Sequence, residues 1–190
     1  MPFRSARRHC QIMTSFVALL RAVNLPGKPL SMAALREMAE GLGFTKVRTL
    51  LQSGNLVFDS DDGDAEALEH RLEAGAKKAL GLDTDIIVRT ADDISEAINA
   101  NPYPEAGRDD PGRLLVVFLK AAPREGALDA LRASIKGTET VEARGRHLYA
   151  VYPDGQGRSK LTMQLIEKHL GTRGTARNWN TVRKLAEMTS

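Results

Sequence analysis

The chain has 190 residues, of which 42% are hydrophobic and 27% are charged, as in an ordinary globular protein with a buried core. No apolar run approaches the roughly 18–20 residues needed to cross a bilayer, so no membrane segment is expected. The single cysteine, Cys10, excludes an intramolecular disulfide and any metal site built from several thiolates. A reducing cytoplasm is therefore the expected location.

The charges of the chain are separated along the sequence. The formal net charge of +3 lies in residues 1–12, which contain basic but no acidic residues. We expect this segment to be a disordered basic leader that precedes a functional start at Met13. Among the charged residues, those in 59–110 are mostly acidic and those in 144–190 are mostly basic. An anionic partner is therefore expected to bind to the C-terminal quarter.

The sequence patterns of residues 13–90 predict strands and helices in the order β-α-β-β-α-β. A continuous apolar run at residues 16–20 predicts a strand buried on both faces. Ser31 is the expected N-cap of a helix that closes at Gly43. The other elements expected here are strands at residues 47–52, 55–59 and 84–89 and a helix over residues 65–79.

Residues 91–112 begin with a short predicted helix and continue as breaker-rich sequence, so we expect them to connect two halves. The same order restarts in residues 113–190, with strands at 114–119, 138–143 and 147–152 and helices near 128–135 and 161–170. A helix over residues 181–188 stands where a final strand would be expected, so this half is predicted to be a variant. The fold class is α+β, with two ferredoxin-like (split βαβ) subdomains packed into one unit.

The first half carries two candidate ligand-binding motifs. Arg21 leaves the first predicted strand and faces the loop that carries Lys28, so two cations can converge on one anion. A structural role for Arg21, in which it holds loop carbonyls, is the alternative. Gln52, Ser53 and Asn55 form a polar turn that offers amide and hydroxyl groups to a base, sugar or peptide. Tight turns also select these residue types for structural reasons.

The second half carries two more candidate motifs. Arg158, Ser159 and Lys160 precede a predicted helix, whose free amide groups together with two cations suit a phosphate or carboxylate. The alternative is a flexible turn in which Ser159 is the N-cap. Arg177 and Asn178 adjoin the only tryptophan, a combination that can stack on a base and hydrogen-bond to it. Alternatively, Asn178 caps the last helix and the tryptophan belongs to the core.

These motifs all lie at predicted strand ends or helix starts, where a rigid scaffold presents its loops. We therefore expect them to converge on one cleft between the two halves. The residues expected there are Arg21, Lys28, Gln52, Asn55, Arg158, Ser159, Lys160 and Arg177. If each motif only closes its own turn, Arg21 and Lys160 should lie on separate faces.

Four ordered motifs span the chain. They are Phe16-Val-Ala-Leu-Leu-Arg-Ala-Val-Asn24 with Gly27-Lys28, Leu51-Gln-Ser-Gly-Asn-Leu-Val-Phe58, Gly157-Arg-Ser-Lys-Leu-Thr162 and Thr175-Ala-Arg-Asn-Trp-Asn-Thr-Val182. Together they resemble the bacterial domain-of-unknown-function family 1697 over residues 13–190. The resemblance implies a cytoplasmic bacterial protein with two ferredoxin-like subdomains, and the family has no established activity to carry over. The chain departs from the family pattern at Ala22 and Pro26, where glycines are common.

The sequence contains no catalytic motif that would identify a reaction. The four histidines show no metal-ligand spacing and no nucleophile elbow is present, so neither a metal nor a cofactor is expected, and binding is favoured over catalysis. We expect a binding protein for an anionic ligand, either nucleic acid or a nucleotide-like metabolite. One alternative is an enzyme that acts on a phosphate-containing small molecule, with Arg158 and Lys160 as electrophilic clamps. Another is a homodimeric, partner-binding scaffold that pairs through exposed sheet edges.

Overall fold

The computed structural model describes residues 13–21, 30–50 and 54–190. These residues form eight strands, seven α-helices and one short 3-10 helix. The strands make two four-stranded antiparallel sheets, so the predicted α+β class is confirmed. The predictions for the basic leader and for Lys28, Gln52 and Ser53 lie outside the described residues.

The first sheet is built from the first half of the chain. In order, the elements are β1 (Thr14–Leu20), α1 (Met32–Gly41), β2 (Thr45–Leu50), β3 (Asn55–Ser60), α2 (Ala65–Leu80), β4 (Ile86–Thr90) and α3 (Ala91–Asn99). The strand order is β2-β3-β1-β4, so β1 has a partner on each side. Residues 16–20 are all buried, as predicted from the apolar run. Ser31 caps α1, where its side chain accepts a hydrogen bond from the Ala34 N–H.

The second sheet repeats this arrangement. After α4 (Pro104–Asp109) come β5 (Leu114–Leu119), α5 (Ala127–Ser134), β6 (Thr140–Arg144), β7 (His147–Val151), the 3-10 helix η1 (Gln156–Arg158), α6 (Met163–Leu170), β8 (Gly174–Asn178) and α7 (Trp179–Thr189). The strand order β6-β7-β5-β8 matches that of the first sheet position by position.

The prediction that a helix replaces the final strand of the second half is wrong. β8 is that strand, and α7 follows it. Its polar residues Thr175 and Arg177 are buried because hydrogen bonds satisfy them, so β8 lacks the apolar pattern that marks a central strand. The first half has the same ending, since α3 follows β4 directly. Thr90 caps α3 as Asn178 caps α7.

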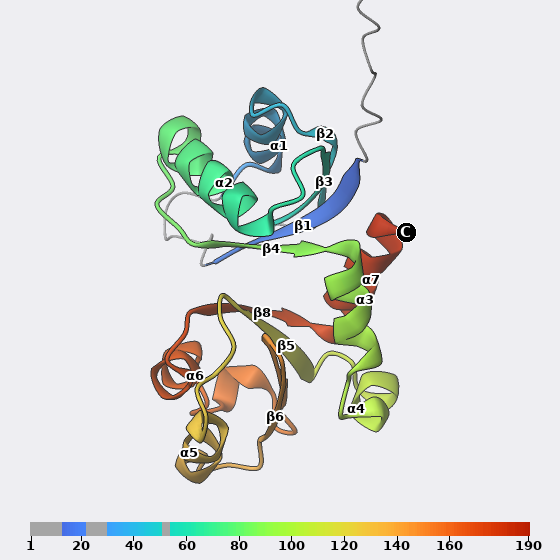
Figure 1. The fold of residues 1–190 in the computed structure, drawn as a ribbon. Coiled ribbons are helices and arrows are strands. Elements are labelled where there is room, and N and C mark those ends of the chain that lie inside the picture. The colour runs from blue at the N-terminus through green and yellow to red at the C-terminus, as the bar shows by residue number, and fades with distance from the viewer. Residues whose placement is uncertain (1–12, 22–29, 51–53) are drawn as a thin grey trace, which may run out of the picture.

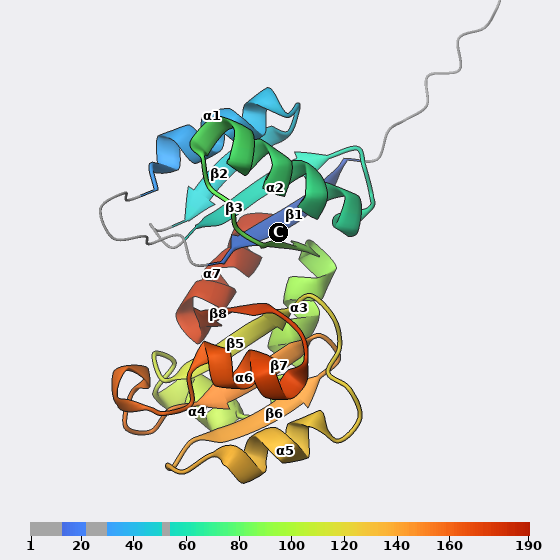
Figure 2. The ribbon, with the colours of Figure 1, turned by 90° about the vertical axis from the view of Figure 1, so that its left-hand side faces the viewer.

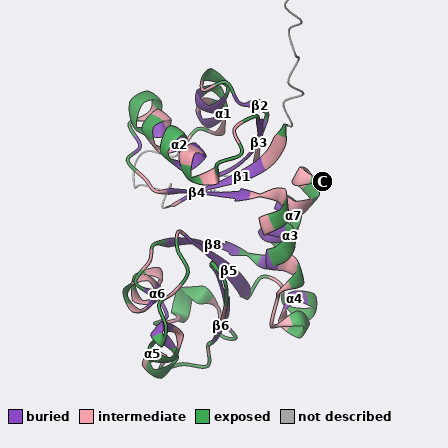
Figure 3. Cartoon of the chain, viewed as in Figure 1, coloured by how far each residue is buried: buried purple, intermediate pink, exposed green. Residues whose placement is uncertain are grey.

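The two halves pack with their sheets facing each other. Figures 1 and 2 show α1 and α2 on the outer side of the first sheet, α5 and α6 on the outer side of the second, and α3 and α7 between the sheets. A buried cluster in this middle layer joins Val17 of β1 and Val116 of β5 to Trp179 and Leu185 of α7. Separate clusters lie under the outer helices. The central strands are therefore buried on both faces, as Figure 3 shows.

Two sheet edges are closed by carboxylates from the neighbouring helices. The N–H groups of Ile86 and Val88 in β4 donate to Glu73 and Glu69 of α2, each at 2.9 Å. The Gly174 N–H in β8 donates to a glutamate of α6 at 3.0 Å. The opposite edge of the first sheet, β2, is interrupted by a β-bulge. Occupied edge donors and bulges both oppose pairing with another chain.

Candidate functional site

Arg177 and Asn55, two of the predicted site residues, meet in a buried cluster between the halves. The Arg177 Nε donates to Asn55 Oδ1, and Nη2 donates to the Leu20 carbonyl at 2.9 Å and the Gly54 carbonyl at 3.3 Å. Nη1 donates to the Thr175 hydroxyl at 2.7 Å and to the carbonyl that precedes Arg177. A guanidinium has five N–H groups, and these bonds use all of them. Arg177 thus ties β8 to the end of β1 and has no N–H left for a ligand.

Asn178 has a structural contact as well. Its Oδ1 accepts from the Thr181 N–H at 2.9 Å and from the Thr181 hydroxyl. This is the standard N-cap arrangement, in which a side-chain oxygen satisfies an unpaired amide of the first helical turn. Asn178 therefore sets the start of α7.

Arg21 makes a bidentate ion pair across the junction between the halves. Its Nε and Nη2 donate to the two carboxylate oxygens of Glu167 on α6, at 3.0 and 2.8 Å. Its Nη1 lies 3.7 Å from Asp85, which also pairs with Arg173 at 2.8 Å. The adjoining cavity of about 450 Å³ is lined by Arg21 and Arg173 and by three carboxylates, Glu73 among them. An anion is poorly matched to this cavity, because acids outnumber the cations.

A second ion pair crosses the junction in the opposite direction. Lys120, which follows β5 as Arg21 follows β1, places its Nζ 2.6 Å from Glu73 and 3.4 Å from Glu69 on α2. Burial alone would lower the pKa of Lys120, but the hydrogen bond to Glu73 and the charge of Glu69 raise it above its ordinary value. Each half thus sends one cation to the other half's helix, the reciprocity that a two-fold interface has.

The loop at residues 155–160 keeps two cations exposed. The side chains of Arg158 and Lys160 form no hydrogen bond or ion pair with the described part of the chain. The Ser159 hydroxyl donates to Glu139 and accepts from the Leu161 N–H at 2.9 Å. The interpretation of Ser159 as a helix N-cap is wrong, because α6 begins only at Met163 and its cap is Thr162. η1 ends at Arg158 and residues 159–162 are not helical, so the helix amides lie farther along the chain than expected.

The predicted convergence on one cleft stays a prediction. Two of its members, Lys28 and Gln52, lie outside the described residues. Among the others, Asn55 and Arg177 contact each other, and Arg21 is paired with Glu167 and Asp85.

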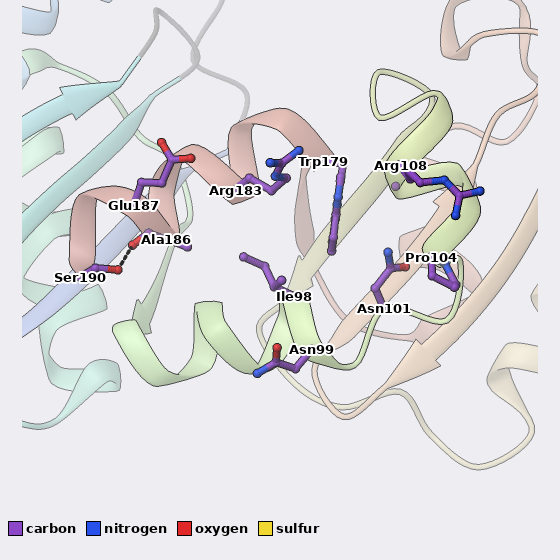
Figure 4. Close-up of a pocket in the computed structure, with 11 residues that line it drawn as sticks. Ile98, Asn99, Asn101, Pro104, Arg108, Trp179, Arg183, Ala186, Glu187 and Ser190 are labelled. Carbon is purple, nitrogen blue, oxygen red and sulfur yellow. Dashed lines mark hydrogen bonds between the residues drawn. The ribbon is translucent and has the colours of Figure 1, made fainter.

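A different concavity lies between α7 on one side and α3 and α4 on the other (Figure 4). Its volume is about 660 Å³. Trp179, which is only 6% exposed, lines it beside Gly107 of α4. A Cβ built at residue 107 would stand 3.0 Å from the indole Nε1, so a side chain there would require the tryptophan or α4 to shift by a few tenths of an ångström. We call this concavity the α4–α7 groove.

The rim of the α4–α7 groove carries charged and polar side chains. Arg183 lies one turn after Trp179 on α7, and Glu187 lies one turn after Arg183. Within the described ranges, neither the Arg183 nor the Glu187 side chain makes a hydrogen bond or ion pair. Arg108 on the opposite wall is paired with Asp109 at 2.7 Å. The groove thus combines an apolar wall with one guanidinium that is free to bind an anionic group.

Neither sheet offers an open face. Phe58 and Phe118, like the other strand aromatics Phe16 and Tyr149, are fully buried. Because helices or the other half cover these strands, bases cannot stack on them as they do on an exposed RNA-binding sheet.

The described residues contain no group of three or more histidine, cysteine and acidic side chains that could hold a metal ion. No helix in the same residues has the length and apolar character that a membrane span needs.

The comparisons with known proteins agree with the resemblance found in the sequence. A family model described as a protein of unknown function (DUF1697) matches residues 13–149. The chain belongs to this family. The DUF1697 chain is also similar to a solved structure, the conserved bacterial protein SP0830 from Streptococcus pneumoniae, at 21% identity and a TM-score of 0.73. The alignment covers 94% of this chain and 100% of that one, and it supports the fold alone. No curated protein matches the sequence.

Sequence reasoning did not identify the α4–α7 groove in this DUF1697 protein. It assigned Trp179 to the core or to base stacking and gave Arg183 no role. The spacing of four residues between them places both on one helical face, which is the signal that was available. The facing wall, with Asn101 and Arg108, comes from a segment interpreted as a connector.

Proposed function

We propose that this DUF1697 protein binds a small anionic ligand in the α4–α7 groove, and that each of its halves is a ferredoxin-like unit. The fold assignment is supported by the element order β-α-β-β-α-β and by the strand order, both of which occur twice. The ligand assignment is carried by one observation. An unpaired guanidinium, Arg183, stands at the rim of a largely apolar groove.

The groove suits a ligand of metabolite size. Its volume falls within the roughly 300–1,000 Å³ typical of small-molecule sites. Ile98 on α3 and Trp179 on α7 offer apolar surface to a planar group, and Arg183 offers a bidentate contact to a phosphate or carboxylate (Figure 4). A nucleotide-like metabolite has both parts. We favour it over nucleic acid because the sheet faces are covered.

Replacing Arg183 by alanine is expected to weaken binding of such a ligand at least 10-fold, because hydrogen bonds to a charged group contribute about 1.5–3 kcal/mol. The chain has a single tryptophan and it lines the groove, so ligand binding is measured directly as a change in Trp179 fluorescence. The titration uses a panel of nucleoside mono-, di- and triphosphates and small organic phosphates.

The matched control is Lys184→Ala. Lys184 is the next residue on α7 and is exposed, but it does not line the groove. This variant should bind as the wild type does. Equal losses in both variants would show a nonspecific charge effect, and no response to the whole panel would reject the proposal.

The same experiment addresses the alternative functions. Chromatography of the ligand after incubation detects turnover, which would favour an enzyme. Light scattering over a concentration series detects a homodimer, although Met13 is the only large hydrophobic side chain exposed in the described ranges. A cytoplasmic location stays a prediction based on the single cysteine.

A further inference from the structure

Two buried arginines occupy equivalent positions at the junction between the halves. Arg89 of β4 pairs with Val17, and Arg177 of β8 pairs with Val116, each three residues before the end of its central strand. Arg89 donates through Nη1 to the carbonyl of the preceding residue and through Nη2 to the last carbonyl of β5. Arg177 does the same toward the last carbonyl of β1. Each half thus reaches into the other with one arginine.

The two contacts differ in the side chain that faces the guanidinium. Arg177 Nε donates to the Asn55 side chain. The residue equivalent to Asn55 is His147, since Asn55 pairs with Leu19 and His147 with Phe118, each one residue before the end of its central strand. No hydrogen bond joins Arg89 to His147. Arg89 Nε and His147 Nε2 are both buried without a partner. An amide therefore secures one arginine, and an imidazole stands unbonded beside the other.

The surroundings of His147 are mostly cationic. Arg89 approaches from β4, and Arg146 precedes His147 in the turn before β7. The acids of the cluster are Asp93 on α3 and Glu69 on α2, which lies 3.9 Å from Arg89 Nη1. Asp93 is shared with Arg146, at 3.8 Å, and with the Thr90 N–H of its own capping box. Phe118 of β5 packs edge-on against the imidazole. A proton on His147 would thus add a third positive charge against two carboxylates, Asp93 and Glu69, and Glu69 is already shared with Lys120.

We propose that His147 is an acid-sensitive latch: protonation of its imidazole releases the Arg89 side of the junction, while the Arg177 side stays closed. At neutral pH both arginines join the halves. In mild acid the imidazolium and the Arg89 guanidinium repel each other in a site that excludes water, and only the Arg177–Asn55 contact holds. This inference does not depend on the proposed ligand.

The direction of the pH effect follows from the buried position. Burial first, and then the charge of Arg89, lower the pKa of His147 from 6.5 to about 4. The opened form, with an ordinary histidine, therefore takes up the proton between about pH 6.5 and 4, and stability present above this range is lost as the pH falls. At pH 5 the opening equilibrium should be about 30-fold more favourable than at pH 7.5.

Amide hydrogen exchange on the full chain tests the latch. We expect protection of the Leu119 and Lys120 amides, which bond to the carbonyls of Arg146 and Arg173, to fall about 30-fold from pH 7.5 to pH 5. Amides of the outer helices α1 and α5 should keep their protection. An equal fall at every amide would show that the proton acts on global unfolding and would overturn the proposal.

Two variants and one titration complete the test. His147→Asn copies the Asn55 arrangement and should remove the pH dependence, whereas His70→Asn, at an exposed histidine of α2, should leave it unchanged. Should His147→Asn fail to fold, the imidazole of the wild type is titrated by NMR. A pKa of His147 at or above 6 would overturn the proposal, and a pKa near 4 is the expected result.

Discussion

Replacing Arg177 by methionine is expected to lower the free energy of unfolding by about 3 kcal/mol or more. Burial lowers the pKa of Arg177 to about 10, so the guanidinium is still charged at neutral pH and donates all its hydrogen bonds. Its removal leaves the carbonyls of Leu20 and Gly54 and the amide oxygen of Asn55 without this donor. Each buried polar group that loses its partner costs about 1–3 kcal/mol. Urea unfolding followed by Trp179 fluorescence measures the loss.

Two further substitutions separate a structural role of Arg177 from a role in ligand binding. Arg158→Met changes an exposed arginine whose side chain has no partner in the described residues, and it should alter stability by no more than about 0.5 kcal/mol. Arg177→Lys keeps the charge but loses the planar fork, so it should lie between the wild type and methionine. If Arg177→Met keeps its stability but binds the ligand more weakly, the prediction from the sequence that Arg177 contacts a ligand would be supported.

The apolar central strands and the capped helices could be predicted from the sequence. β5 occupies residues 114–119, the same residues as the apolar run. A strand buried on both faces is apolar at every position, so its ends can be read from the sequence. Ser31 begins α1 and residues 65–80 form α2 for equally local reasons, an N-cap and a regular apolar stripe.

The elements that were missed depend on tertiary contacts. β8 buries Arg177 and Thr175, and these residues are tolerated there only because the other half supplies their hydrogen-bond partners. α4 begins at Pro104, which suggests a loop when the sequence is considered alone. Proline is well suited to the first turn of a helix, where its missing N–H is not needed.

Prediction of the site was limited in the same way. Arg21 and Arg177 were identified as important polar residues, but the sequence does not show that Glu167 and Asn55 from the opposite halves are their partners. Because Arg21 and Arg177 are paired within the protein, these two predicted ligand contacts instead hold the halves together. The groove beside Trp179 requires α4 to pack against α7, and no local pattern in either segment indicates that contact.

Replacing Gly174 by alanine is expected to destabilise the fold by about 1–3 kcal/mol, although only one methyl group is added. A Cβ at this position would stand 2.9 Å from the Phe118 carbonyl oxygen and 2.9 Å from side-chain carbons of Val117 and Leu119. β8 would have to move away from β5, and the Gly174 N–H would move away from Glu167 Oε1, which it bonds at 3.0 Å. Because Glu167 also holds Arg21, the strain reaches the junction between the halves.

The matched control for Gly174→Ala is Gly41→Ala, which is expected to change stability in the opposite direction. Gly41, at the end of α1, has no atom within 4 Å of a built Cβ, so alanine there should stabilise the protein by about 0.5–1 kcal/mol through the lower entropy of the unfolded chain. Urea unfolding of both variants under one condition gives the comparison. Equal stability of Gly174→Ala and the wild type would mean that β8 can shift away from β5 without cost.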